Sequence, residues 1–124
     1  MELAVSVQTD GTTQVVVLPA TGKWERISRM INPSGEVLID RVRTGFTNCS
    51  VWVDESGRLK NLDPNPYAQL VTMHPEPIVG PMVLTGPPED HTGEIQGFTP
   101  EQAEALAIAI HRAQMAITGG PTSP

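Results

Sequence analysis

An acidic loop with a histidine is the part of this sequence closest to a catalytic or metal-binding set. Glu89, Asp90 and His91 are consecutive, Glu94 follows in the same segment, and His74 could add a further ligand. Carboxylate and imidazole groups bind divalent metals or transfer protons. Such ligands are usually held by rigid elements, whereas these neighbours lie in a glycine- and proline-rich loop. We therefore assign no metal, no cofactor and no catalytic residue, and keep a metal-assisted hydrolase only as an alternative.

Four basic residues form a second candidate site. Arg41 and Arg43 share one face of an expected strand, and Arg58 and Lys60 share a face of another. Together they could bind a phosphorylated or nucleotide ligand through bidentate contacts. The competing interpretation is that they pair with neighbouring acids, because residues 1–62 carry seven basic and seven acidic side chains. We favour the second interpretation and keep the phosphate site as an alternative.

Other signatures of chemistry are missing from the sequence. There is no nucleophile elbow and no dinucleotide fingerprint, and the segment GPMVLTG at residues 80–86 lacks the lysine and the glycine spacing of a phosphate-binding loop;. Cys49 is the only cysteine, so the chain can form no internal disulfide. Because it alternates with Val51 and Val53, we expect a buried thiol rather than a nucleophile. Enzymatic activity is thus not indicated.

Length and charge narrow the class of protein. The chain has 124 residues, enough for one domain, and 39% of them are apolar but only 4% aromatic;. Its net charge of −6 falls in the second half, where residues 63–124 carry seven acids and only Arg112 as a base. That charge disfavours nucleic-acid binding. No apolar run approaches the roughly 20 residues that span a membrane, and no leader is visible, so we expect a cytoplasmic protein.

Turn and strand signals predict an α+β domain. Apolar alternation before Asp10-Gly11 and a β-branched apolar run after it predict a hairpin over 3–18, and a short helix follows over 22–31;. The β-branched segments 36–43 and 48–54 predict a second hairpin. We expect hairpin, helix and hairpin to build one antiparallel sheet.

The second half of the chain is expected to add one strand and one helix. Seven of the twelve prolines lie between residues 64 and 88, so we expect 78–85 to be an edge strand;. Thr99, Pro100 and Gln102 form a helix start signal, and the helix should end near Ile117. The expected domain is 1–117, followed by a disordered tail over 118–124.

The final helix carries more apolar surface than one sheet can cover. One stripe should lie on the sheet; its members are Ala103, Leu106, Ala107, Ile110, Ala113 and Ile117;. The far side is apolar as well, which indicates cover by the proline-rich segment or by a second chain. We expect a homo-oligomer, by default a two-fold dimer. The interface residues we expect are Ala105, Ile108, Ala109, Arg112 and Met115.

A succession of motifs gives the chain a family resemblance. The order is VWVDESGRLKNLDPNPYAQL, then IVGPMVLTG, then an acidic loop, then FTPEQAEAL. It resembles a domain-of-unknown-function family of bacteriophages, mobile elements and Gram-positive bacteria. The resemblance implies a phage or mobile-element origin and transfers no catalytic residue to Asp54, Asn65 or Gly86.

Our leading hypothesis is a non-enzymatic phage or mobile-element accessory protein. It would bind a host factor as an interaction module, in host takeover or against a host defence. The surplus apolar face of the final helix is the main reason for this choice. Besides the ligand binder and the hydrolase named above, a virion component stays open.

Overall fold

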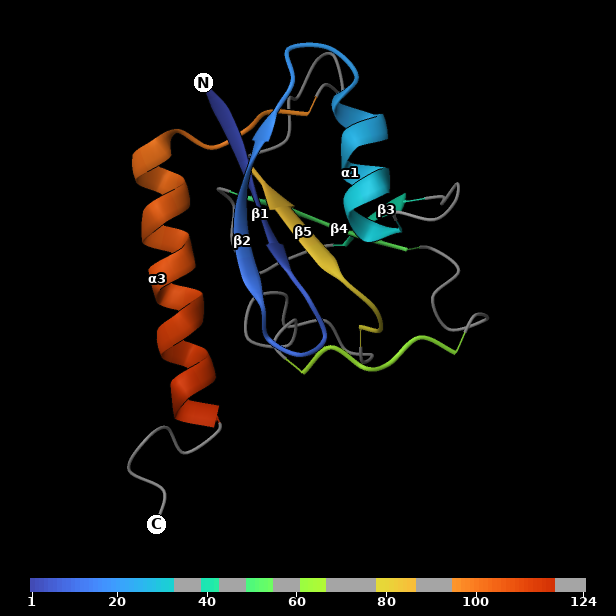
Figure 1. The fold of residues 1–124 in the computed structure, drawn as a ribbon, viewed down its shortest axis with the longest axis vertical. Coiled ribbons are helices and arrows are strands. Elements are labelled where there is room, and N and C mark those ends of the chain that lie inside the picture. Colours follow the sequence, from blue (N-terminus) through green and yellow to red (C-terminus); the bar gives the residue numbers. More distant parts are fainter. Residues whose placement is uncertain (33–38, 43–48, 55–60, 67–77, 87–94, 118–124) are drawn as a thin grey trace.

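The computed structural model describes residues 1–32, 39–42, 49–54, 61–66, 78–86 and 95–117. Within these ranges five strands and two helices are present, as drawn in Figure 1. In chain order they are β1 Glu2–Val7, β2 Thr13–Leu18, α1 Lys23–Ile31, β3 Ile39–Val42, β4 Ser50–Asp54, β5 Met82–Thr85 and α3 Pro100–Ile117.

The strands form one antiparallel sheet in the order β2-β1-β5-β4-β3. β1 and β2 make the first predicted hairpin, and β3 pairs with β4 in the second. The predicted α+β domain, built from hairpin, helix and hairpin with a C-terminal helix on the sheet, is confirmed.

The prediction of an edge strand over 78–85 was wrong. β5 lies in the middle of the sheet, between β1 and β4. Pro81 stands immediately before the strand, so no proline interrupts its ladder. All four residues of β5 are buried, which is typical of a central strand covered on both faces;. Gly80, with φ of 80°, makes the bend ahead of it;.

The two helices cover opposite faces of the sheet. On one face, Val5 of β1 belongs to the same apolar cluster as Ala103 and Ile110 of α3. On the other face, Ala4 belongs to a cluster with Ile27 and Ile31 of α1. Neighbouring strand residues point to opposite faces, so β1 contributes to both cores. Figure 1 shows α3 running alongside β2 and α1 on the far side of the sheet.

The start of α3 is fixed by its own side chains and by β1. Thr99 Oγ1 accepts a hydrogen bond from Gln102 N–H at 3.2 Å, and Gln102 Oε1 accepts one from Thr99 N–H at 3.0 Å. This is the predicted capping pair. Just before it, Phe98 and Leu3 exchange two backbone hydrogen bonds of 2.7 and 2.9 Å. The helix ends at Ile117, as predicted.

Neither of the described helices is long and apolar enough to cross a lipid bilayer. The predicted tail over 118–124 lies outside the described residues.

Candidate functional site

An exposed apolar surface lies where α3 passes beside β2. Four large side chains are exposed there: Val15 at 46%, Val17 at 55%, Ile108 at 45% and Met115 at 37%. We call these four residues, together with Glu104 and Arg112 of α3, the β2–α3 surface. Isolated exposed apolar residues are common on proteins, but a group on adjoining elements marks an interaction site more often.

The pairing register explains why the two valines are exposed on the α3 face. Val15 is opposite Val5, and Val17 is opposite Leu3. Those β1 partners belong to the core beneath α3, so Val15 and Val17 point to the same side of the sheet;. Among the described strands β2 is the outermost one on this side of the sheet, and α3 does not reach far enough over it to bury the two valines.

Hydrogen bonds hold α3 in place beside β2. Gln114 Nε2 donates to the carbonyl oxygen of Gly11 at 2.8 Å and to Thr13 Oγ1 at 3.3 Å. Gly11, with φ of 94°, forms the turn between β1 and β2;. With the bridge from Phe98 to Leu3 at the other end, α3 is tied to the hairpin near both of its ends. The exposed surface is therefore presented on a fixed frame.

A shallow groove of about 440 Å³ runs along this surface. Its polar side chains are those of Glu104 towards one end and of His111 and Arg112 towards the other. Its floor and walls are mainly apolar; the full lining is Val15, Pro100, Glu104, Ala107, Ile108, His111 and Arg112. Because the apolar lining lies between Glu104 and Arg112, the groove is suited to receiving apolar side chains flanked by opposite charges;.

The predicted interface residues of α3 all lie at the surface. Those exposed in the single chain are Ala105, Ile108, Ala109, Arg112 and Met115. The described part of the chain therefore does not cover them. Sequence reasoning missed Val15 and Val17, because the run of three valines indicated only a strand of the first hairpin. A signal that could have found them is the position of the hairpin in the sheet. A hairpin strand that has no further strand on its outer side forms the sheet edge, where side chains are less well covered.

The predicted phosphate site is not assembled by the described residues. Arg41 lies on β3, where its backbone is opposite Trp52. Arg43, Arg58 and Lys60 lie outside the described residues.

The acidic loop also falls outside that part of the chain, as do Glu89, Asp90, His91, Glu94 and His74. Among the residues that are described, no group of three histidine, cysteine, aspartate or glutamate side chains could hold a metal ion.

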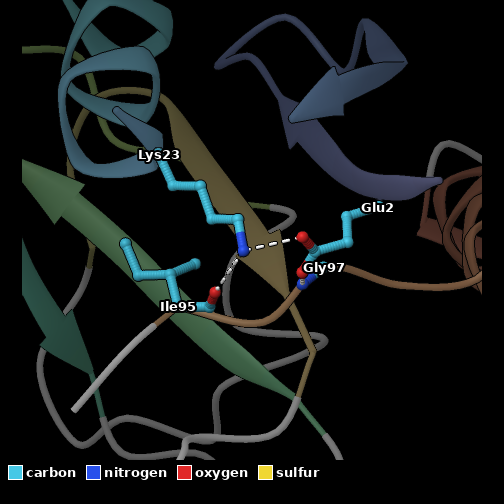
Figure 2. Close-up of polar contacts among 4 residues, drawn as sticks. All are labelled: Glu2, Lys23, Ile95 and Gly97. Carbon is cyan, nitrogen blue, oxygen red and sulfur yellow. Dashed lines mark hydrogen bonds and ion pairs between the residues drawn. The ribbon is translucent and has the colours of Figure 1, made fainter. Parts of the chain in front are cut away.

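The clearest polar cluster among the described residues joins three segments, as Figure 2 shows. Lys23 Nζ lies 2.7 Å from Glu2 Oε2 and donates to the carbonyl oxygen of Ile95 at 3.1 Å. Gly97 N–H donates to Glu2 Oε1 at 2.9 Å. Lys23, and then the Gly97 amide, lower the pKa of Glu2. The carboxylate is thus held ionised by structural partners, and the cluster fastens β1, α1 and the segment ahead of α3.

The residues of the family-like motifs have structural roles. Asn65 is buried, and its Nδ2 donates to the carbonyl oxygens of Val7 and Gly80 at 3.2 and 3.0 Å. A Cβ on Gly86 would lie 2.9 Å from the carbonyl oxygen of Gly97, so only glycine fits without a shift. These motif residues shape the sheet and its connections.

Comparison with known proteins agrees with the resemblance at the level of the family. The family model described as "Domain of unknown function (DUF3846)" matches residues 6–111. No curated protein and no solved structure gives a significant match. Since the match spans most of the chain, this protein belongs to the DUF3846 family.

Proposed function

We propose that this chain is a non-enzymatic interaction module that binds a protein through the β2–α3 surface. The observation that carries the proposal is the joint exposure of Val15, Val17, Ile108 and Met115 on two elements fixed against each other. Covering such side chains on binding is favourable by roughly 25 cal/mol for each Å² of apolar area removed from water. A host factor bound in the cytoplasm, in host takeover or against a host defence, is the setting that a phage or mobile-element origin would supply.

The charges of the surface favour a protein partner over nucleic acid. The groove carries Glu104 as well as Arg112, and the second half of the chain is acidic. A phosphate backbone would be repelled by much of this half. A protein surface that presents an apolar side chain between one acid and one base would match the groove.

Affinity capture with matched variants tests the proposal. The tagged chain, its Ile108→Glu variant and its Thr21→Glu variant are incubated with lysate of a bacterial host and with untagged chain. Thr21 is exposed in the connection from β2 to α1 and belongs to neither β2 nor α3, so it adds the same charge outside the surface. We expect a bound protein that Ile108→Glu loses and Thr21→Glu keeps. An identical set of bound proteins for all three chains would overturn the proposal.

A further inference from the structure

We propose that the protein covering the β2–α3 surface is a second copy of this chain, placed by a two-fold axis perpendicular to the sheet. The two β2 strands then pair antiparallel and the two α3 helices pack against each other on one face. This inference rests on the proposed function, since it names the partner of the same surface.

The outer edge of β2 offers backbone groups ready for another strand. Gln8 N–H donates to the carbonyl oxygen of Thr12 at 2.9 Å, so this is a hydrogen-bonded pair. Bonded and non-bonded pairs alternate along an antiparallel ladder. The N–H and C=O groups of Thr13, Val15 and Val17 therefore point away from β1. β2 carries no charged residue, proline or glycine, the features that usually keep a further strand away from an edge;.

With a two-fold axis beside Val15, all of these outward N–H and C=O groups form hydrogen bonds with the second copy. Val15 of one copy then lies opposite Val15 of the other, and Thr13 lies opposite Val17 of the other copy. The two five-stranded sheets become one continuous sheet across this pairing. The exposed valines of both copies meet on the α3 face.

The charges on α3 are arranged symmetrically about Ile108. Glu104 precedes it by four residues and Arg112 follows it by four, and all three line the groove. In an antiparallel helix pair centred on Ile108, each Glu104 faces Arg112 of the other copy. Within one chain the two residues lie about 12 Å apart along the helix axis, too far to pair. An antiparallel second copy satisfies both charges.

The spacing of the layers allows both contacts at once. α3 packs over β1 and β2. Neighbouring strands lie about 4.8 Å apart. A helix above the gap between β1 and β2 is therefore about 5 Å, measured across the strands, from a two-fold axis halfway between the two β2 strands. Its symmetry mate is then about 10 Å away, close to the distance at which two helices pack. Val15 and Ile108 line the same groove. A single two-fold axis therefore brings Val15 near Val15, and Ile108 near Ile108, of the other copy.

Oxidative crosslinking tests the register. In a Cys49→Ser background, Val15→Cys places two thiols on opposed residues, whose Cα atoms are about 5.5 Å apart in a bonded pair, within the range for a disulfide. We expect a covalent dimer. Val17→Cys is the matched control, because Val17 is at least as exposed as Val15 but faces Thr13 of the other copy. Equal crosslinking of the two variants, or none for Val15→Cys, would overturn the register.

A charge exchange tests the helix contact. Glu104→Arg and Arg112→Glu, each alone, place like charges together twice across the axis, and we expect the dimer dissociation constant to rise about tenfold. The double variant restores opposite charges and should return to the wild-type constant in sedimentation equilibrium. Additive weakening in the double variant would contradict the proposed pairing.

The outcomes separate this inference from the proposed function. A wild-type chain that sediments as a monomer at every concentration overturns the second copy as the partner. If Ile108→Glu then still loses a host protein that Thr21→Glu keeps, the proposed function stands with a different occupant. If the chain is a dimer that Ile108→Glu leaves intact, the axis is wrong.

Discussion

The centre of the sheet and its β2 edge cover their apolar residues in different ways. At the centre, Met82, Val83 and Leu84 of β5 are fully buried between the two helical layers. At the edge, Val15 and Val17 remain half exposed beside α3. The centre holds the IVGPMVLTG motif, whereas the FTPEQAEAL motif begins α3 and includes Glu104 of the β2–α3 surface. The centre therefore maintains the fold, whereas the edge leaves apolar area available for binding.

The buried amide of Asn65 should give the largest effect at the centre. Asn65→Ala removes two hydrogen bonds and leaves the carbonyl oxygens of Val7 and Gly80 without that donor. We expect a loss of about 3 kcal/mol in the free energy of unfolding, measured by urea denaturation. Asp63→Asn, at an exposed neighbouring position, is the control and should change little. A loss below about 0.5 kcal/mol for Asn65→Ala would show that the hydrogen bonds of this residue contribute little to the stability of the fold.

The close approach of Gly97 to β1 should rank second. An added Cβ would lie 2.5 Å from Glu2 Cβ and 2.8 Å from Leu3 N. Gly97→Ala therefore forces the segment ahead of α3 away from β1, at a cost of about 2 kcal/mol. Thermal unfolding followed by circular dichroism measures it. A variant as stable as the wild type would show that this segment is not tightly packed.

The Glu2 cluster should give a smaller, pH-dependent effect. The pKa of Glu2 is lowered in the folded chain, so its contribution is present above the unfolded value near 4.5 and is lost as pH falls through the folded pKa;. Because the side chain is 39% exposed, solvent screening limits the contribution to less than about 1 kcal/mol;. Comparing Glu2→Gln with the wild type from pH 7 to pH 3 should show two stability curves that converge on acidification. Parallel curves would contradict the assignment.

Ile108→Glu should have the smallest effect on the stability of a single chain. Ile108 is exposed on α3, and glutamate is a good helix former, so we expect a change within about 0.5 kcal/mol under monomeric conditions;. Urea denaturation at low protein concentration measures it. A loss of several kcal/mol would mean that Ile108 belongs to the core, and the contrast between centre and edge would fail.

The sequence predicted the strands and helices better than it predicted which of them lie side by side. Alternation, Asp10-Gly11 and the Thr99 capping pair depend on local rules, and the structure confirms the hairpins and the start of α3. The place of β5 was missed because strand order depends on contacts between distant segments. The apolar run Met82-Val83-Leu84 was a signal of a central strand, but the prolines around it pointed to an edge.

The candidate surface could be predicted only in its helical half. An apolar face on a helix is visible in its periodicity, which is how Ile108 and Met115 were identified. Val15 and Val17 are exposed only because no described strand follows β2, and strand order is not written in their local sequence. A basic patch built on Arg41 likewise depended on side chains from separate segments meeting in space.

Amide hydrogen exchange in β2 tests most directly whether the β2–α3 surface is covered in solution. The N–H groups of Thr13, Val15 and Val17 point away from β1 and pair with no other described strand, so we expect them to meet water in a lone chain. At high protein concentration we predict slow exchange at these three amides in the wild type and fast exchange in Ile108→Glu. Fast exchange in both proteins would contradict the account.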